Sequence, residues 1–261
     1  MMRIVLVGGT GRIGSRVAAK LLGHDVVVAA RSTGVDSASG AGMGEALSGA
    51  DVVVDVTRPP ASEPAAADAF FRRSTTNLLR EGRSAGVGHH VALTIVGTRR
   101  HPDIPYYAAK AMQERLIRGS GMPYTLVHAT QFFEFVGGIA DAATAGGSVR
   151  LPRSLVQPIA ADDVADALVR TILAPPMNDD VEIAGPERFP LDDFVRRALV
   201  ARNDSRLVLA DHRARYFGGR IGTRTLLPGA HAAIGTTRFD TLLTQLRSSA
   251  VTAISPLPAE L

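Results

Sequence analysis

Closely spaced glycines near the N-terminus are the first residues whose type and spacing indicate chemistry. Gly8, Gly9, Gly11 and Gly14 follow the apolar run IVLV at residues 4–7. Glycine lets a backbone turn tightly and approach a pyrophosphate, and it lets the next helix pack closely on its strand. Gly9, Gly11 and Gly14 satisfy G-x-G-x-x-G, whereas Gly8, Gly11 and Gly14 satisfy G-x-x-G-x-x-G, and both alignments stay open. Either alignment predicts a dinucleotide-binding turn with the phosphates at a helix N-terminus.

A tyrosine and a lysine four residues apart form the second motif. Tyr106 and Lys110 belong to a Y-x-x-x-K pattern on a predicted helix over residues 106–118, so they share one helix face. In carbonyl chemistry, Tyr106 would donate a proton to a developing alkoxide, while Lys110 would hold a ribose and lower the pKa of the tyrosine. Lys20 and Lys110 are the only lysines in an arginine-rich chain. Because arginine poorly replaces a compact, tunable charge, we interpret Lys110 as functional and Tyr107 as a packing residue.

Such a reaction also needs a hydroxyl group near the carbonyl oxygen. Thr94 lies near the end of a predicted strand over residues 90–96, and Thr98 follows it. Thr94 is our candidate for the catalytic hydroxyl and Thr98 is the alternative. A threonine in a strand is more often structural, and no pair of serines is present at this strand end.

Other polar residues carry weaker signals. His128 ends a predicted strand, where it is either a general acid or phosphate contact or, more commonly, a hydrogen-bonded structural histidine. Asp162 is the predicted N-cap of a helix rather than a catalytic carboxylate. The His, Asp and Glu residues lack convincing metal-ligand spacing, so we predict no metal site. A nucleophile elbow of the G-x-S-x-G type is also missing from the sequence.

Apolar runs alternate with helical patterns along the first two thirds of the chain. Alternation of this kind predicts an α/β fold with a doubly wound parallel sheet, in which ligands bind at the carboxyl ends of the strands. The predicted strands cover residues 4–7, 25–31, 50–57, 90–96 and 122–128, and a long helix covers residues 65–85.

The predicted binding residues lie at these strand ends. We expect the cofactor to contact Gly8, Thr10, Gly11, Arg12, Ile13, Gly14, Arg31, Ser32, Val56, Thr57, Thr94, Lys110, Ala129 and Thr130. Gln131 and Phe132, which follow the last of these strands, are the candidate walls of a substrate site.

The end of the second strand bears on cofactor choice. An Asp or Glu there would bind a free ribose 2'-hydroxyl and repel the 2'-phosphate of NADP, but the chain has Ala30-Arg31-Ser32. Arg31 can meet the phosphate, with Ser32 as a second donor. The alternative is an ordinary surface arginine. We predict that NADP(H) is favoured over NAD(H).

Length and composition limit the architecture. A chain of 261 residues that is 46% hydrophobic can bury a large core. We predict a nucleotide-binding core over residues 1–130, to which residues 155–174 return, and a smaller substrate-binding lobe over residues 131–261. The absence of cysteine excludes disulfides and thiolate sites. With no secretory or membrane-spanning pattern, we expect a cytoplasmic protein, a small-molecule substrate and no membrane contact.

The net charge of +4 arises from 29 basic and 25 acidic residues, which is nearly balanced. Arginine is concentrated between Arg196 and Arg224, where only Asp204 and Asp211 are acidic. A solvated face is the favoured interpretation, and an anionic ligand or a partner surface is the alternative. Few aromatic residues accompany these arginines, so nucleic-acid binding is not expected.

Five segments together resemble the atypical short-chain dehydrogenases with NmrA-like NAD(P)-binding proteins. They are GGTGRIG, ADVVVDVT, PYYAAKAMQERLI, GMPYTLVHATQFFEF and QPIAADDVA, in order within residues 2–173. The resemblance implies a Rossmann core, a small C-terminal lobe and NAD(P)H binding. It also implies either a reductase, for example of quinones or isoflavonoids, or a redox-sensing regulator without turnover that binds a protein partner.

We therefore expect an NADP-dependent oxidoreductase that reduces a small carbonyl, quinone or enone by hydride transfer. A non-catalytic NADP(H) sensor is the alternative. Both functions need the same glycine turn, so the sequence motif alone does not separate them.

Overall fold

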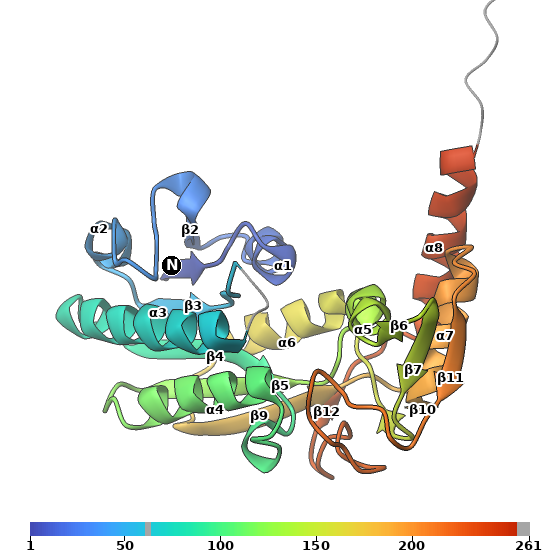
Figure 1. The fold of residues 1–261 in the computed structure, drawn as a ribbon. Coiled ribbons are helices and arrows are strands. Elements are labelled where there is room, and N and C mark those ends of the chain that lie inside the picture. The colour runs from blue at the N-terminus through green and yellow to red at the C-terminus, as the bar shows by residue number, and fades with distance from the viewer. Residues whose placement is uncertain (61–63, 255–261) are drawn as a thin grey trace, which may run out of the picture.

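The computed structural model describes residues 1–60 and 64–254. Its centre is a seven-stranded parallel sheet with the order β12-β9-β5-β4-β3-β1-β2 (Figure 1). The predicted doubly wound parallel sheet is therefore confirmed. The strands are β1 (Arg3–Val7), β2 (Asp25–Ala29), β3 (Val52–Asp55), β4 (His89–Ile95), β5 (Tyr124–Ala129), β9 (Asp179–Ala184) and β12 (Ala233–Ile234).

Helices cover both faces of this sheet. Ile4 and Leu6 pack on the side of α1 (Arg12–Lys20) and α6 (Ala161–Leu173). Val5 and Val7 pack on the opposite side, which is covered by α2 (Met43–Leu47), α3 (Pro64–Ser84) and α4 (Pro105–Arg118). Because successive side chains of a strand point to opposite faces, a central strand between two helix layers must be apolar throughout. The continuous valine and isoleucine runs in the sequence follow from this requirement.

The strand order creates a switch point at β1. The chain passes from β1 outward to β2 and then crosses back to β3 on the other side of β1. Helices that leave neighbouring strands in opposite directions open a crevice at the carboxyl ends of those strands, where doubly wound sheets bind ligands. The glycine turn follows β1 and therefore lies at this crevice.

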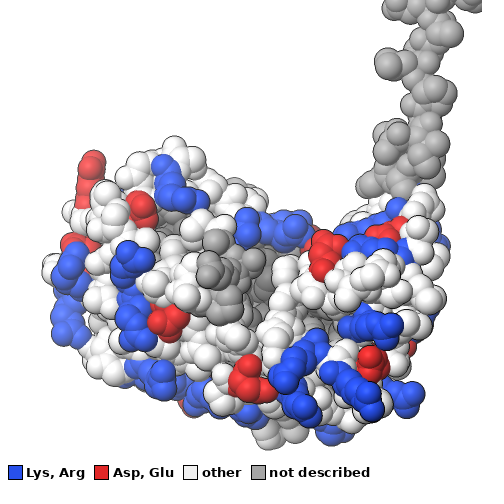
Figure 2. Space-filling model, in the orientation of Figure 1, with Lys and Arg blue, Asp and Glu red and all other residues white. Residues whose placement is uncertain are grey.

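A smaller lobe stands beside the sheet (Figure 1). Phe133, Phe189, Phe194 and Phe239 form its aromatic centre, with ring centroids between 4.7 and 6.2 Å apart. Figure 2 shows the surface hollowed between the sheet and this lobe. The elements of the lobe are η3 (Phe133–Phe135), α5 (Val136–Ala142), β6 (Thr144–Ala145), β7 (Ser148–Leu151), β8 (Leu155–Val156), β10 (Phe189–Pro190), α7 (Leu191–Ala201), β11 (Leu207–Ala210) and α8 (Phe239–Ile254).

The prediction that Asp162 caps α6 is wrong. The N-cap is Ala160, and the carboxylate of Glu134 accepts the N–H of Ala161 at 3.1 and 3.2 Å. Asp162 lies within the first helical turn and pairs with Arg16 at 3.2 Å. A carboxylate from outside the helix thus caps it. The negative charge of Asp162 in the first turn still interacts favourably with the positive end of the helix dipole.

Two strands of the sheet, β9 and β12, come from the C-terminal part of the chain and were not predicted. Asp179, Asp180 and Glu182 interrupt the apolar pattern of β9. Asp179 is exposed, whereas Asp180 pairs with Arg99 at 2.6 Å and with Arg118. Within the described residues, no helix has the length and apolar character needed to cross a membrane.

Candidate functional site

The glycine turn after β1 has no room for larger side chains. Gly8 has φ +85° and packs against the backbone of Val56, which follows β3. A Cβ atom on Gly14 would lie 2.5 Å from the carbonyl oxygen of Gly8 and the Cα atom of Gly9. Gly9 is equally confined, since its Cβ would lie 2.8 Å from the carbonyl oxygen of Leu6. The structure thus uses the glycines of both alignments, and the resulting cradle fits a pyrophosphate at the start of α1.

Arg31 and Ser32 lie just beyond β2, in the short helix η1 (Arg31–Thr33). Both are exposed. In the part of the chain that the structure describes, no carboxylate lies within 4.0 Å of the Arg31 guanidinium, so its charge is available to an incoming anion. A contact between Arg31 and a 2'-phosphate stays a prediction.

Lys110 lies at the centre of a buried polar chain. Its Nζ atom donates to the carbonyl oxygen of Leu93 at 2.9 Å and to Oε1 of Gln113 at 2.8 Å, and it lies 4.4 Å from the centroid of the Phe71 ring. Gln113 in turn donates to Asp55 at 2.8 Å. Lys110 is only 5% exposed. Burial lowers the pKa of Lys110 to about 8, although the negative charges of Asp55 and Glu114 act to raise this pKa.

At its other end, this series of hydrogen bonds reaches the loop after β3. Oδ1 of Asp55 accepts the N–H of Thr57 at 2.9 Å and its hydroxyl at 2.7 Å. Hydrogen bonds therefore connect Lys110 on α4, through Gln113 and Asp55, to Thr57 beside the glycine turn. Asp55 and Gln113 were not predicted as site residues. The available signals were an acidic residue that ends an otherwise apolar strand and a glutamine three positions after the lysine.

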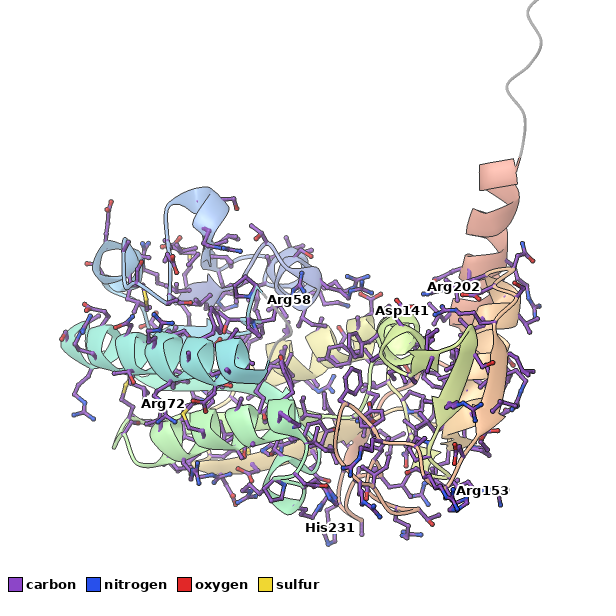
Figure 3. The ribbon with its side chains drawn as sticks, in the orientation of Figure 1. Arg58, Arg72, Asp141, Arg153, Arg202 and His231 are labelled. Atoms are coloured by element: carbon purple, nitrogen blue, oxygen red, sulfur yellow. The ribbon has the colours of Figure 1, made fainter. Side chains whose placement is uncertain are left out.

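Tyr106 lies against Phe71, with ring centroids 5.8 Å apart in an edge-to-face arrangement. Burial raises the pKa of Tyr106 to about 12, while the positive charge of Arg58 acts in the opposite direction. Arg58 is exposed and follows β3 on the side of the sheet that faces the smaller lobe (Figure 3). The sequence interpretation gave this electrostatic role to Lys110 and missed Arg58. At neutral pH the tyrosine is a phenol, which is the form that can donate a proton.

Thr94 turns toward α4 instead of the crevice. Its hydroxyl donates to Glu114 at 2.6 Å, and the hydroxyl of Thr98 donates to the same oxygen at 2.7 Å. His128 lies 3.8 Å from this carboxylate, and burial lowers the pKa of the histidine. These contacts give Thr94 and His128 structural partners, and a catalytic role for Thr94 stays a prediction.

Two residues just after β5 have buried polar atoms without a partner in the described part of the chain. Thr130 Oγ1 and Gln131 Oε1 are buried and lack a hydrogen-bond partner among the described residues. The amide nitrogen of Gln131 donates to the hydroxyl of Tyr107 at 3.0 Å, so Tyr107 is both a packing residue and a polar partner. Buried polar atoms are rarely left unpaired, so these two oxygens are candidates for contacts that the described residues do not supply.

The predicted residues are thus only partly brought together. Thr10 and Arg12 are exposed at the turn, whereas the Ile13 side chain packs into the core between the sheet and the helices α1 and α6. Ala129 is buried at the end of β5, and Phe132 packs beside the same core.

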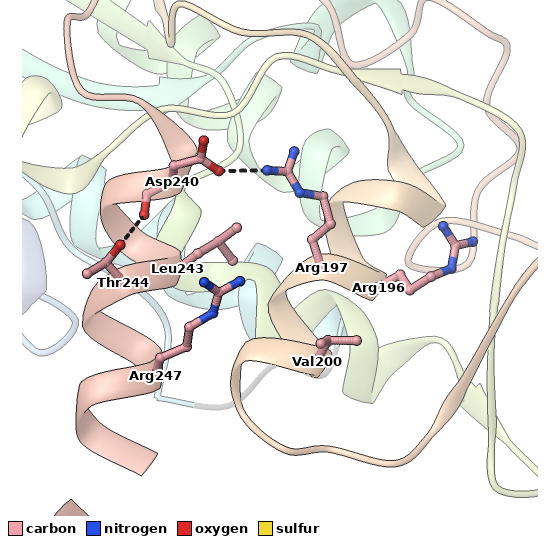
Figure 4. A pocket seen from close by; sticks show the side chains of 7 residues that line it. All are labelled: Arg196, Arg197, Val200, Asp240, Leu243, Thr244 and Arg247. Atoms are coloured by element: carbon pink, nitrogen blue, oxygen red, sulfur yellow. Dashed lines mark hydrogen bonds and ion pairs between the residues drawn. The ribbon is translucent and has the colours of Figure 1, made fainter. Parts of the chain in front are cut away.

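A separate cavity of about 260 Å³ lies between α7 and α8, within the smaller lobe (Figure 4). Arg197 pairs with Asp240 at 2.7 Å across it, and Arg196 pairs with Asp192 at 2.8 Å on its own helix. Both arginines thus have carboxylate partners, and the interpretation of the arginine-rich segment as a solvated face stays a prediction.

The pKa of Lys110 makes a prediction about stability. The folded protein releases the lysine proton near pH 8, whereas the unfolded chain keeps it to about pH 10.5. The unfolded state therefore binds more protons between these values, and stability rises with pH in this window. We expect the free energy of unfolding of wild type, minus that of Lys110→Met, to increase by about 2–3 kcal/mol between pH 8 and 10. Urea unfolding at each pH measures this difference, and a flat or falling difference contradicts the lowered pKa.

Comparison with known proteins decides the family. A family model described as NAD(P)H-binding matches residues 30–175. The chain belongs to this NAD(P)H-binding family. The match confirms the resemblance to the atypical, NmrA-like short-chain dehydrogenases.

A curated relative adds a second comparison. The photosystem II assembly factor Ycf39 of Synechocystis sp. is 24% identical over 149 residues, which cover 51% of this chain and 46% of that protein. The match thus spans about half the length of the curated relative.

Two solved structures are similar to this protein over nearly the whole of its chain. RMD from Pseudomonas aeruginosa, complexed with NADPH, has a TM-score of 0.70 and 14% identity, covering 97% of this chain and 100% of its own. The UDP-glucose 4-epimerase of Thermotoga maritima has a TM-score of 0.72 and 16% identity, covering 97% and 99%. At these identities the similarity establishes the Rossmann-type fold alone.

Proposed function

We propose that this protein is an NADP-dependent oxidoreductase that reduces a small carbonyl, quinone or enone. The observation that carries the proposal is the buried chain from Lys110 through Gln113 and Asp55 to Thr57, which ties the Y-x-x-x-K helix to the loop beside the glycine turn. The chain supplies the acceptors that a buried ammonium group needs, and it also extends past the lysine to the loop beside the glycine turn.

Each residue has a defined task in this proposal. Bound NADPH supplies the hydride. Lys110, oriented by Leu93 and Gln113, holds the ribose hydroxyls. Tyr106 donates its phenolic proton to the oxygen that becomes an alkoxide, and Arg58 stabilises the phenolate that remains. Thr130 and Gln131 offer their unpaired oxygens to ligand N–H or O–H donors.

The preference for NADP leads to a prediction for Arg31→Ala. We expect its NADPH dissociation constant to rise by about 10- to 100-fold, since a charge-assisted hydrogen bond to phosphate contributes about 1.5–3 kcal/mol. The NADH dissociation constant should change less than about twofold. Cofactor fluorescence titration measures both, and the chain has no tryptophan to interfere.

The matched control is Arg72→Ala, which removes an arginine from the exposed face of α3. It should leave both dissociation constants unchanged. Equal affinity of wild type for NADPH and NADH, or an equal loss for both in Arg31→Ala, would remove the NADP assignment.

A second candidate function is a sensor that binds NADP(H) without turnover and acts on a protein partner. The similarity to an assembly factor favours it. A sensor should distinguish NADPH from NADP⁺ in affinity and should not oxidise NADPH with any acceptor. Steady-state NADPH oxidation with quinones and aldehydes therefore separates the two functions.

A further inference from the structure

The cavity between α7 and α8 is separate from the site to which we assign the cofactor. Both helices lie at the edge of the smaller lobe opposite the seven-stranded sheet (Figure 1). Of the described residues that line the cavity, none belongs to the glycine turn or to α4. Its volume of about 260 Å³ is just below the range of about 300–1,000 Å³ that is typical of pockets for drug-sized ligands. A ligand of this cavity is therefore a smaller molecule.

Three arginines line this cavity, and they differ in their partners. Arg197 pairs with Asp240 at 2.7 Å, and Arg196 pairs with two carboxylates of its own helix, the nearer at 2.8 Å. Among the described residues, no carboxylate lies within 4.0 Å of the guanidinium of Arg247, which belongs to α8. Arg247 thus brings a positive charge that the described side chains do not neutralise by pairing.

Arginine side chains reach into the cavity from both helices. In Figure 4, Arg247 extends from α8 toward α7, while Arg197 extends from α7 toward α8. Arg197 is held in place by aromatic rings, because its guanidinium carbon lies 5.3 Å from the centroid of the Phe189 ring and 5.4 Å from that of Phe239. Within the described part of the chain, Arg247 has neither an ion pair nor a ring contact. A fixed guanidinium on one side and an unpaired one on the other therefore border the cavity.

Apolar side chains from both helices also line the cavity. Leu243 precedes Arg247 by one helical turn, so both lie on the same face of α8. Leu243 is almost fully buried, whereas Val200 on α7 is 65% exposed. Covering an exposed valine with another apolar group is favourable through the hydrophobic effect. The lining thus suits a ligand that combines apolar surface with negative charge.

We propose that this cavity binds a small organic acid that carries one carboxylate on a compact apolar body, such as an aromatic ring. The carboxylate accepts hydrogen bonds from the guanidinium of Arg247, whose planar fork of donors matches a carboxylate. The apolar body covers Val200 and Leu243. This site goes beyond the proposed oxidoreductase function, because it is separate from the cofactor turn and its occupation needs no NADPH.

The charge of the cavity favours a single carboxylate over a phosphate. A phosphate monoester has a charge of about −1.5 to −2 at neutral pH, whereas a carboxylate has a single negative charge. Asp240 already adds a carboxylate to the lining, and among the lining arginines only Arg247 is not paired with a described carboxylate. One additional negative charge therefore balances the cavity, and a second one would be repelled by Asp240.

An NMR chemical-shift titration of the full chain with phenylacetate tests the site. We expect saturable binding to wild type with a dissociation constant of about 1 mM or lower, and shifted amide signals at Val200, Leu243 and Arg247. In Arg247→Gln, which keeps polar bulk but loses the charge, the dissociation constant should rise at least about tenfold. Saturating NADPH should leave phenylacetate binding by wild type unchanged. Wild-type affinity in Arg247→Gln, or displacement of phenylacetate by NADPH, overturns the proposal.

Arg202→Gln is the matched control. Arg202 is also exposed and lies at the C-cap of α7, but it does not line the cavity (Figure 3). This variant should bind phenylacetate with wild-type affinity and, like Arg247→Gln, should unfold at the temperature of wild type. An equal loss of phenylacetate affinity in both variants shows a general effect of surface charge and contradicts a site at Arg247.

Two analogues separate the charge of the ligand from its apolar body. Phenylacetamide has the ring but no charge, and acetate has the charge but no ring, so each should bind at least about tenfold more weakly than phenylacetate. Val200→Asp changes an exposed side chain and places a further carboxylate at the cavity, so it should weaken phenylacetate binding by about tenfold or more as well. Equal binding of phenylacetamide and phenylacetate, or no binding of phenylacetate by wild type, overturns the proposal.

Discussion

Replacing Gly14 with alanine is expected to raise the NADPH dissociation constant by about 100-fold or more and to lower the free energy of unfolding by about 1–3 kcal/mol. The added Cβ would lie 2.5 Å from backbone atoms of Gly8 and Gly9, which cannot rotate away as a side chain can. Gly14 is within α1, where alanine is intrinsically better than glycine by about 1 kcal/mol. The steric clash therefore has to outweigh a favourable helix propensity, and the displaced turn loses its fit to a pyrophosphate.

Gly44→Ala is the matched control. Gly44 is also within a helix, α2, but the nearest atom to an added Cβ is a carboxylate oxygen of Glu81 at 3.4 Å, at the end of a side chain that can move. We expect this variant to bind NADPH normally and to be as stable as wild type, or more stable by about 0.5–1 kcal/mol. Fluorescence titration and urea unfolding measure both properties. Normal NADPH binding by Gly14→Ala would contradict the assignment of this turn to the cofactor.

Replacing Lys110 with methionine is expected to reduce turnover by about 10²- to 10⁴-fold, the range for removal of groups that support proton transfer. Stability at neutral pH should change by no more than about 2 kcal/mol. Methionine fills the space beside Phe71 and removes a costly buried charge, but it leaves Leu93 and Gln113 without a hydrogen-bond donor. The two stability effects oppose each other, whereas nothing offsets the loss of the ammonium group from catalysis.

Lys20→Met is the control for this substitution, because Lys20 is the only other lysine. It pairs with Asp166 at 2.6 Å at the end of α1, and surface pairs contribute little to stability. Steady-state kinetics with NADPH should show wild-type turnover for Lys20→Met. Wild-type turnover by Lys110→Met would exclude the proposed role of Lys110.

Local patterns in the sequence were sufficient to predict the elements around the crevice. Continuous valine runs identified the central strands, because only strands covered on both faces need them. The glycine spacing located the turn, and the position of Arg31 followed from its place after β2. These features depend on neighbours along the chain, so periodicity and turn chemistry reveal them.

Contacts between distant residues could not be predicted in the same way. Gln113 and Asp55 are 58 positions apart, and their hydrogen bond exists only because α4 packs against β4, the neighbour of β3 in the sheet. The capping of α6 by Glu134 spans 27 positions, which made the nearby Asp162 look like the better candidate. The charge of Arg58 near Tyr106 also arises from the meeting of two segments, the loop after β3 and α4.

The most direct test of the proposed function is acceptor-dependent oxidation of NADPH by the wild-type protein, followed by absorbance for a panel of quinones, enones and aldehydes. We expect steady-state turnover with at least one acceptor, with kcat/KM at least about tenfold higher for NADPH than for NADH. Tight NADPH binding without oxidation by any member of the panel would contradict it and would favour the cofactor sensor.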